Sequence, residues 1–278
     1  VVASALDTDL GNDIKYAGAL TVTDIATSDK VAALTSYTTA ETGATTNTLA
    51  ADGTWSLAVG ALTTALGDGV RLAGALTVTG ITDEAAALTD YTATTTGATS
   101  VTLTANGAWS VAAADLAAAL GDGVLLDGTL AVTSIASGSE TAALTAYTDA
   151  LTGATSVTLT ASDTNWSVAA ATLDTALAAA VRLNGDLTVI DIASDDEAGA
   201  STTYSKTATG ASNVMLTASD GTWSVAASAL DTDLGNDIKY EGALTITSIT
   251  DKTAALTDYT TTKTGATTNT LTADGNWS

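Results

Sequence analysis

Residues 101–124 read VTLTANGAWSVAAADLAAALGDGV, and variants of this stretch recur along the whole chain. Its Trp-Ser pair is found in five copies whose tryptophans are spaced by 54, 57, 57 and 54 residues. A fixed period of this size is typical of a tandem-repeat array, in which each unit is one small structural module. Cutting after each Trp-Ser predicts five units with no residue left over: 1–56, 57–110, 111–167, 168–224 and 225–278.

The outermost units show no polar cap, which stacked repeats need where an array ends. In addition, Ala3–Tyr16 is identical to Ala227–Tyr240, four units later, whereas the copies between them differ. We therefore expect the chain to be a segment of a longer array.

The start of each unit has the pattern of a short helix. In 57–110, Val59, Leu62, Leu66 and Val70 recur at steps of three and four residues, which places them on one helical face. The following Gly67-Asp68-Gly69 can adopt the left-handed conformation that ends a helix. In 168–224 the same place holds three alanines, so the expected stop is weaker there.

The rest of each unit has the patterns of strands. Residues 70–79 alternate apolar and polar side chains with a period of two, interrupted by Gly74. The segment AALTDYT around Tyr91 fits either a helix or the entry of a strand. A hairpin with the loop Ala105-Asn106-Gly107 would pair Leu103 with Trp109 on one face.

These patterns predict a mainly β fold. We expect a tandem-repeat array of five units of about 55 residues, each with about four strands and one short helix. Units this small bury little surface alone, and no linker separates them, so we expect them to stack or share strands. Ig-like beads and a β-solenoid remain alternative geometries.

All the aromatic side chains fall at repeat positions, which is typical of buried core residues. An exposed platform that stacks on glycans is the alternative. The expected core positions are Trp55, Trp109, Trp166, Trp223, Trp277, Tyr37, Tyr91, Tyr147, Tyr204 and Tyr259.

Composition narrows the class of function. The net charge is −23, and the 8 Lys and Arg residues are scattered singly, which argues against nucleic acid and anionic lipid as partners. The chain has no His and no Cys, so the common pairs of nucleophile and base are unavailable and we expect no enzymatic activity. No apolar run is long enough to span a membrane.

One acidic motif is a candidate calcium site. Alternating carboxylates near a glycine resemble a calcium loop, because Ca²⁺ prefers six to eight oxygen ligands. The competing interpretation places the same acids on the wet face of the predicted helix. No other cofactor is expected, and the candidate ligands are Asp7, Asp9, Asp13, Asp231, Asp233 and Asp237.

The stretch VMLTASDGTWSVAASAL (214–230) resembles the Ig-like repeats of giant bacterial cell-surface adhesins of the biofilm type. Those repeats commonly join a D-G-T-W-S-V hairpin to an A-A-x-L helix-turn that ends in D-G. The matching residues here are 52–56, 220–225, and 113–116 with 121–123. The resemblance implies an extracellular protein on a bacterial surface.

We therefore expect a structural, non-enzymatic, extracellular repeat protein that forms part of a surface fibre, sheath or adhesin stalk. Its partners would be neighbouring repeats and copies of itself in a self-assembled filament, and surface glycans are a further possible partner. The alternative function is a calcium- or glycan-binding adhesion module.

Overall fold

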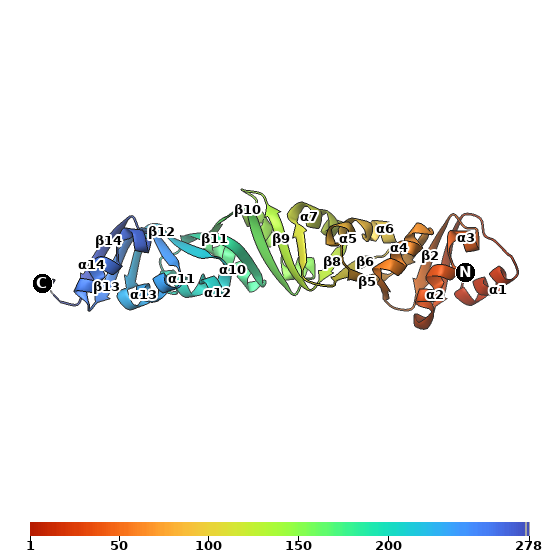
Figure 1. Ribbon diagram of the computed structural model, residues 1–278, viewed down its shortest axis with the longest axis horizontal. Coiled ribbons are helices and arrows are strands. Elements are labelled where there is room, and N and C mark those ends of the chain that lie inside the picture. The colour runs from red at the N-terminus through yellow and green to blue at the C-terminus, as the bar shows by residue number, and fades with distance from the viewer. Residues whose placement is uncertain (276, 278) are drawn as a thin grey trace. The chain divides into compact units, whose positions relative to one another are not determined.

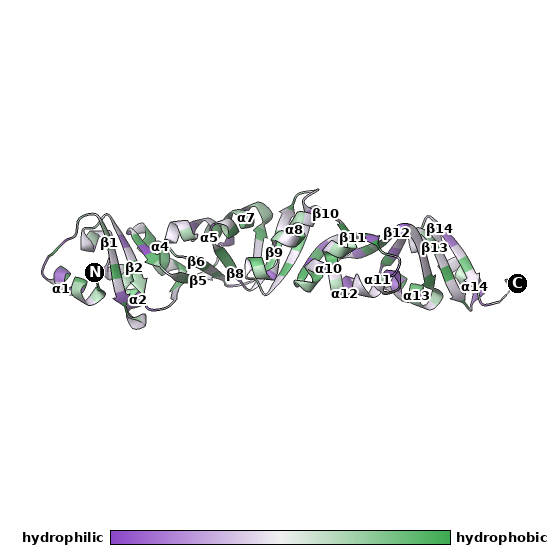
Figure 2. Ribbon diagram, turned by 180° about the vertical axis from the view of Figure 1, so that it is seen from behind, coloured by the Kyte–Doolittle hydropathy of each residue, from purple (hydrophilic) through white to green (hydrophobic). Residues whose placement is uncertain are grey.

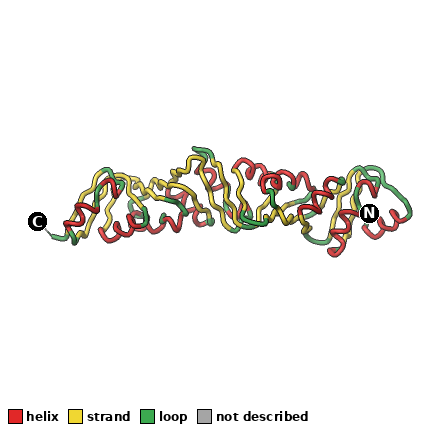
Figure 3. Tube along the Cα trace, in the orientation of Figure 1, coloured by secondary structure: helices red, strands yellow, loops and turns green. Residues whose placement is uncertain are grey.

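The computed structural model describes residues 1–275 and 277. It is an α/β fold with about 37% helix and 39% strand, and its sheets of three, four and seven strands are all parallel. Helices and strands alternate along the chain (Figure 3). The prediction of a mainly β repeat array is therefore wrong, and the antiparallel Ig-like sandwich and the β-solenoid are wrong with it.

Two compact units divide the chain, and each is described by itself. The first comprises residues 1–131 and 150–156, and the second comprises 132–149 and 157–278. Figure 1 follows the elements by colour and label.

The longest helices have nine residues and lie where the apolar stripe predicts a helix. In α4, Leu62 and Ala65 point into the core, and the chain then turns through Gly69 in the left-handed conformation. At the corresponding turn in the second unit Ala180 adopts the same conformation, with a φ of 56°. The nine-residue helices are α1 (Ala3–Gly11), α4 (Val59–Gly67), α7 (Ala113–Gly121), α10 (Ala170–Ala178) and α13 (Ala227–Gly235).

Two further helices lie at and just after the segment that the sequence left undecided between helix and strand, and the second of them replaces a predicted strand. The first has seven residues: α2 (Lys30–Ser36), α5 (Glu84–Asp90), α8 (Glu140–Ala146), α11 (Glu197–Thr203) and α14 (Lys252–Asp258). A four-residue helix follows: α3 (Thr39–Thr42), α6 (Ala93–Thr96), α9 (Asp149–Thr152), α12 (Lys206–Thr209) and α15 (Thr261–Thr264). A 3₁₀ turn, η1 (Thr27–Asp29), precedes α2. The expectation of one short helix per repeat is thus wrong, because this Ala- and Thr-rich segment is helical.

The strands alternate buried apolar residues with more exposed small and hydroxyl residues, as the banded hydropathy along the strands in Figure 2 illustrates. In the first half of the chain they are β1 (Ala19–Ile25), β2 (Thr46–Ala51), β3 (Trp55–Ala58), β4 (Val70–Ala73), β5 (Ala75–Ile81), β6 (Ser100–Ala105), β7 (Trp109–Ala112), β8 (Val124–Asp127) and β9 (Thr129–Ile135). The later strands are β10 (Ser156–Ala169), β11 (Val181–Ile192), β12 (Asn213–Ala226), β13 (Ile238–Ile249) and β14 (Thr268–Ala273).

Within each unit, each extended segment of the chain pairs with the next extended segment. In the first unit β2 pairs with β4 and β3 pairs with β5, so β2–β3 and β4–β5 are two neighbouring extended segments, each interrupted midway. In the second unit β10, β11, β12, β13 and β14 pair in that order. A helical connection returns the chain between neighbouring strands, as a parallel sheet requires.

The predicted hairpin is wrong at Trp55, Trp109, Trp166 and Trp223, and the one at Trp277 lies partly outside the described residues. Leu216 and Trp223 lie on the single strand β12, and their partners in β13 are Tyr240 and Leu244. The three or four residues of the expected loop form an irregularity in the extended chain and do not reverse its direction. In β12 the pairing register shifts between Thr217 and Thr222. Both Leu216 and Trp223 are nevertheless buried.

Each buried tryptophan is tied to the interruption in the next strand. The indole nitrogens of Trp55, Trp109, Trp166 and Trp223 donate at 3.0 Å to the backbone carbonyls of Ala73, Asp127, Asn184 and Glu241. Each of these carbonyls belongs to the residue before a glycine with positive φ: Gly74, Gly128, Gly185 and Gly242. The glycine gives the strand the bend that turns a carbonyl toward the indole.

Replacing Gly242 by alanine should destabilise the protein more than the same change at Gly128. Both residues have a similar positive φ, 105° and 110°, so both variants share a backbone cost of about 1–2 kcal/mol. Only at Gly242 would the new Cβ meet a backbone atom, the Gly221 carbonyl oxygen at 2.4 Å. We expect an additional loss of about 1–3 kcal/mol for Gly242→Ala in denaturant unfolding. Equal losses in the two variants would contradict this contact.

Candidate functional site

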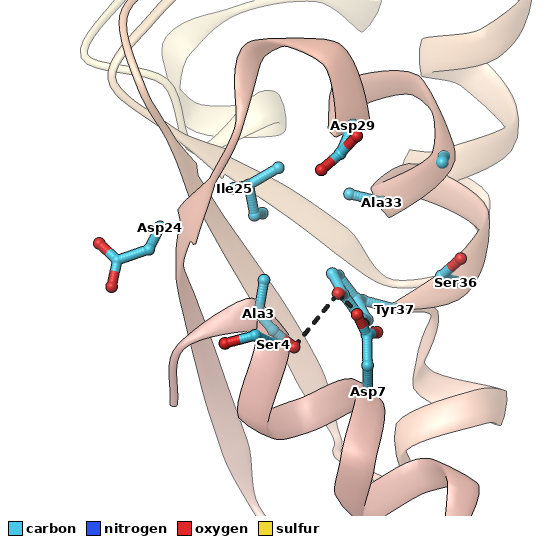
Figure 4. Close-up of a pocket in the computed structure, with 10 residues that line it drawn as sticks. Ala3, Ser4, Asp7, Asp24, Ile25, Asp29, Ala33, Ser36 and Tyr37 are labelled. Carbon is cyan, nitrogen blue, oxygen red and sulfur yellow. Dashed lines mark hydrogen bonds between the residues drawn. The ribbon is translucent and has the colours of Figure 1, made fainter.

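At the end of four of the seven-residue helices, α2, α5, α11 and α14, a tyrosine bonds a nine-residue helix. Tyr37 follows α2, and its hydroxyl donates at 2.8 Å to the carboxylate of Asp7, the fifth residue of α1. Figure 4 shows Tyr37 beside Asp7 among the residues that line a small cavity. The cavity has a volume of about 280 Å³ and is also lined by Ser4, Asp24 and Asp29.

The same bond recurs at the same place in other helix pairs. Tyr259 donates at 2.9 Å to Asp231, the fifth residue of α13. Tyr204 bonds the carboxylate of Asp174, the fifth residue of α10. Tyr91 shares a 2.6 Å hydrogen bond with the hydroxyl of Thr63, the fifth residue of α4. The position therefore acts as a polar latch between consecutive helices, and we call this contact the Tyr latch.

Burial and a neighbouring carboxylate change the acidity of Tyr37, Tyr204 and Tyr259 in the same direction. Burial, reinforced by the Asp231 hydrogen bond and charge, raises the pKa of Tyr259 to about 12. The same two causes, in the same order, raise the pKa of Tyr37 and of Tyr204 further above the usual value. These phenols are therefore hydrogen-bond donors at neutral pH and poor candidates for a general base.

The candidate calcium ligands are held by separate partners. Asp9 and Asp233 accept hydrogen bonds from Tyr16 and Tyr240. Asp237 forms a 2.8 Å ion pair with Lys206, which lowers the pKa of the Asp237 carboxyl. Asp13 lies in the turn after α1 with a φ of 59°.

Asp7 and Asp231 serve the Tyr latch, so neither acidic set converges on one point. Within residues 1–275 and 277, no three Asp or Glu side chains form a group that can hold a metal ion.

Two larger cavities lie between seven- or four-residue helices and a nine-residue helix. One of about 490 Å³ is lined by Ser201, Ser205 and Lys206 on one side and by Thr232 and Asp233 on the other. Another, of about 440 Å³, includes Arg71, Asp90 and the Thr63–Tyr91 pair. Their hydroxyl and carboxylate groups can hydrogen-bond a polar molecule, but those that carry the latch are already engaged with each other.

All but one of the aromatic side chains expected in the core are buried. Four of the tryptophans are at most 2% exposed and all five expected core tyrosines are buried, whereas Trp277 is 43% exposed. The sequence reasoning missed Thr63 and Asp174 as latch partners, although the shared fifth helical position was a detectable signal.

It also missed Lys30, whose ammonium lies 5.8 Å from the ring centre of Trp55 and donates at 2.7 Å to the Thr54 carbonyl.

Removing either partner of the Tyr259–Asp231 latch should destabilise the protein, and the two losses should not add. We expect Tyr259→Phe and Asp231→Ala to couple by about 0.5–1.5 kcal/mol in a double-mutant cycle of denaturant unfolding. Thr232→Ala, next to Asp231 on the exposed side of α13, is the matched control and should not couple with Tyr259→Phe. Strict additivity of the Tyr259 and Asp231 losses would show that the hydrogen bond contributes nothing to stability.

None of the helices in the described part of the chain is long and apolar enough to cross a membrane. No family model, curated protein or solved structure matches this chain.

Proposed function

We propose that this chain is a structural, non-enzymatic, extracellular repeat protein, a length of surface fibre, sheath or adhesin stalk. The observation that carries the proposal is the reuse of one set of contacts from segment to segment. The tryptophan bond spans 18 residues in each of its four occurrences, and the Tyr latch meets the fifth residue of a nine-residue helix in each of its four occurrences.

The recurrence of these contacts supports a structural role for the polar side chains that take part in them. The carboxylates and phenols that the sequence marks as candidates hold neighbouring helices together, and the indole nitrogens hold neighbouring strands. Because the tryptophan bond and the Tyr latch recur along the chain, such a chain can be lengthened by repeating contacts that it already contains. The acidic composition keeps a long polymer soluble, and it agrees with the resemblance to surface adhesins.

Single-molecule stretching of the 278-residue chain tests the proposal. A load-bearing repeat protein should release its length in several steps and refold when relaxed, since stability resides in contacts between neighbours. A step that frees about 55 residues would lengthen the chain by at most about 180–200 Å. One all-or-none event that releases the whole chain without refolding would contradict a stalk or fibre role.

Melting in the presence of calcium separates the proposal from the alternative of a calcium-binding adhesion module. The structural proposal predicts the same melting temperature with Ca²⁺ and with a chelator at constant ionic strength. A rise that only Ca²⁺ produces, and that a chelator reverses, would favour the alternative.

A further inference from the structure

Seven-residue helices pack against later nine-residue helices at a recurring contact, and the residues at this contact are of two chemical kinds. In the first kind, a buried leucine of the seven-residue helix faces a buried alanine, the seventh residue of the next nine-residue helix, as α5 and α7 show with Leu88 and Ala119. The strand that follows carries a buried leucine. Three junctions are of this Leu kind: Leu34 with Ala65 and Leu72, Leu88 with Ala119 and Leu126, and Leu144 with Ala176 and Leu183.

The junction between α11 and α13 is of the second kind, which we call the Ser kind. Ser201 replaces the leucine, Asp233 replaces the alanine and Tyr240 replaces the strand leucine. The Tyr240 hydroxyl donates to Asp233 and is hydrogen-bonded by Ser201. Its ring meets Trp223 edge to face, with 4.9 Å between the ring centres. Asp233 and Tyr240 are both buried, so the three polar groups satisfy one another inside the fold.

Two half-junctions have no partner segment in the described structure. One is the face formed by α1, Ile14 and Tyr16, in which Tyr16 bonds Asp9 as Tyr240 bonds Asp233. We call it the Asp–Tyr face. Its sequence is identical to that of 227–240, yet Ile14 is 46% exposed whereas Ile238 is 1% exposed. Strand β12, which pairs with Ile238, accounts for the difference.

The other half-junction is the face formed by α14 and β14, which we call the Leu face. Leu256 is 65% exposed, although Leu34, Leu88 and Leu144 at the same helical position are buried. Leu271 on β14 is likewise half-buried where Leu49 on β2 is fully buried. The Leu face thus carries leucines at the same positions as the seven-residue helices and strands of the internal Leu-kind junctions.

We propose that the Leu face docks a helix–strand segment with alanine at the seventh helical position and leucine in the strand, and that it rejects the Asp–Tyr face of a second copy. Leu256 set against Asp9 and Tyr16 would remove water from a carboxylate and a phenol without the hydroxyl that Ser201 supplies. Leucine is also larger than serine at a packed position. The partner is therefore a further repeat of the 57–72 type, and the inference rests on the proposed structural function.

Exchanging the two kinds between the faces of the full chain tests the proposal. The four proteins are the unmodified chain, L256S, the double variant D9A/Y16L, and the triple variant that combines all three changes. The two matched proteins, L256S and D9A/Y16L, should self-associate with an apparent Kd at least about tenfold below that of the two mismatched ones. Sedimentation velocity over a concentration series measures this, in enough salt to screen the negative charge.

The L256S variant is the most informative arm, because it removes an exposed apolar side chain and is nevertheless expected to increase association. The triple variant carries the same apolar Asp–Tyr face as D9A/Y16L and controls for nonspecific stickiness. Equal association in all four proteins, or association of the triple variant as strong as that of D9A/Y16L, would overturn the proposal. Unfolding steps of the unmodified chain under force are unaffected by either outcome, so the two failures are distinguishable.

The internal Ser-kind junction provides a second readout. S201L alone and D233A/Y240L alone should each lower the melting temperature, because each creates a mismatched junction. The triple variant S201L/D233A/Y240L recreates the Leu kind and should recover much of the loss. If the triple variant lowers the melting temperature by the sum of the two separate decreases, the three residues do not act as one matched set, and the proposal is overturned.

Discussion

Replacing Trp109 by alanine should lower the free energy of unfolding by about 3–5 kcal/mol, the usual loss when a buried aromatic ring is truncated in a core. The Trp109 side chain is fully buried, and its indole donates to the Asp127 carbonyl. The substitution therefore leaves both a large void and a backbone oxygen without its donor. Denaturant unfolding followed by circular dichroism measures the loss.

Trp277→Ala is the matched control, since it changes the same repeat position in a 43% exposed side chain. We expect it to change stability by no more than about 0.5 kcal/mol. Trp109→Phe separates the two contributions, because it preserves much of the ring volume and removes the indole nitrogen. Similar small losses at Trp109 and Trp277 would instead favour an exposed platform that stacks on a ligand.

The helix at the start of each unit could be predicted from sequence because its apolar spacing has one structural meaning. Val59, Leu62 and Leu66 recur with helical periodicity, and α4 occupies that segment. The strands were also marked by their alternation. Their direction was not, because alternation shows which side chains share a face and not which strand lies beside them.

The fold class was predicted wrongly at two local ambiguities. Ala105-Asn106-Gly107 fits a hairpin loop, and in the structure Ala105 ends β6 and the next two residues lead on toward β7. The AALTDYT segment fits helix or strand, and in the structure α5 occupies it. Taking the first as a hairpin removes the need for a helical crossover, so the two choices together change a parallel α/β fold into a mainly β one.

The sequence was sufficient to single out the aspartates and tyrosines of the candidate site, but it did not show which of them bond each other. The acids of α1 were placed on a helix, and Tyr37 was placed at a core position. The two side chains meet because the fold brings the end of α2 beside α1, although Tyr37 and Asp7 are 30 positions apart in the sequence. The calcium hypothesis grouped Asp7 and Asp9 by their spacing along the chain, whereas the structure gives each a different tyrosine partner.

Raising the pH above about 10 should unfold the protein before its buried tyrosines ionise, because an unperturbed phenol titrates near that pH. Burial raises the pKa of each of the following side chains, joined by a hydrogen bond to a carboxylate in most of them: Tyr16, Tyr37, Tyr147, Tyr204, Tyr240 and Tyr259. For Tyr16 the Asp9 hydrogen bond is the largest cause.

The sign follows from comparing the two states. Below about pH 10 these phenols are protonated in both the folded and the unfolded chain, so they add no pH dependence. At higher pH the unfolded chain releases phenolic protons that the folded protein retains, up to about pH 12 at Tyr259. Stability is therefore lost as the pH rises through this window, and the ionised phenols add to a net charge that is already −23.

A single alkaline titration followed by tyrosinate absorbance and by far-ultraviolet circular dichroism measures this. The two signals should change together, because the buried phenols ionise when the fold opens. Tyr259→Phe should make the loss of stability with pH less steep, since it removes one proton that only the unfolded chain releases. Repeating the titration at raised salt separates the contribution of general charge repulsion, which salt screens. Tyrosinate absorbance that rises around pH 10 for most of the tyrosines, while the circular dichroism stays that of the folded protein, would show that the phenols are not held in the latch and core environments described.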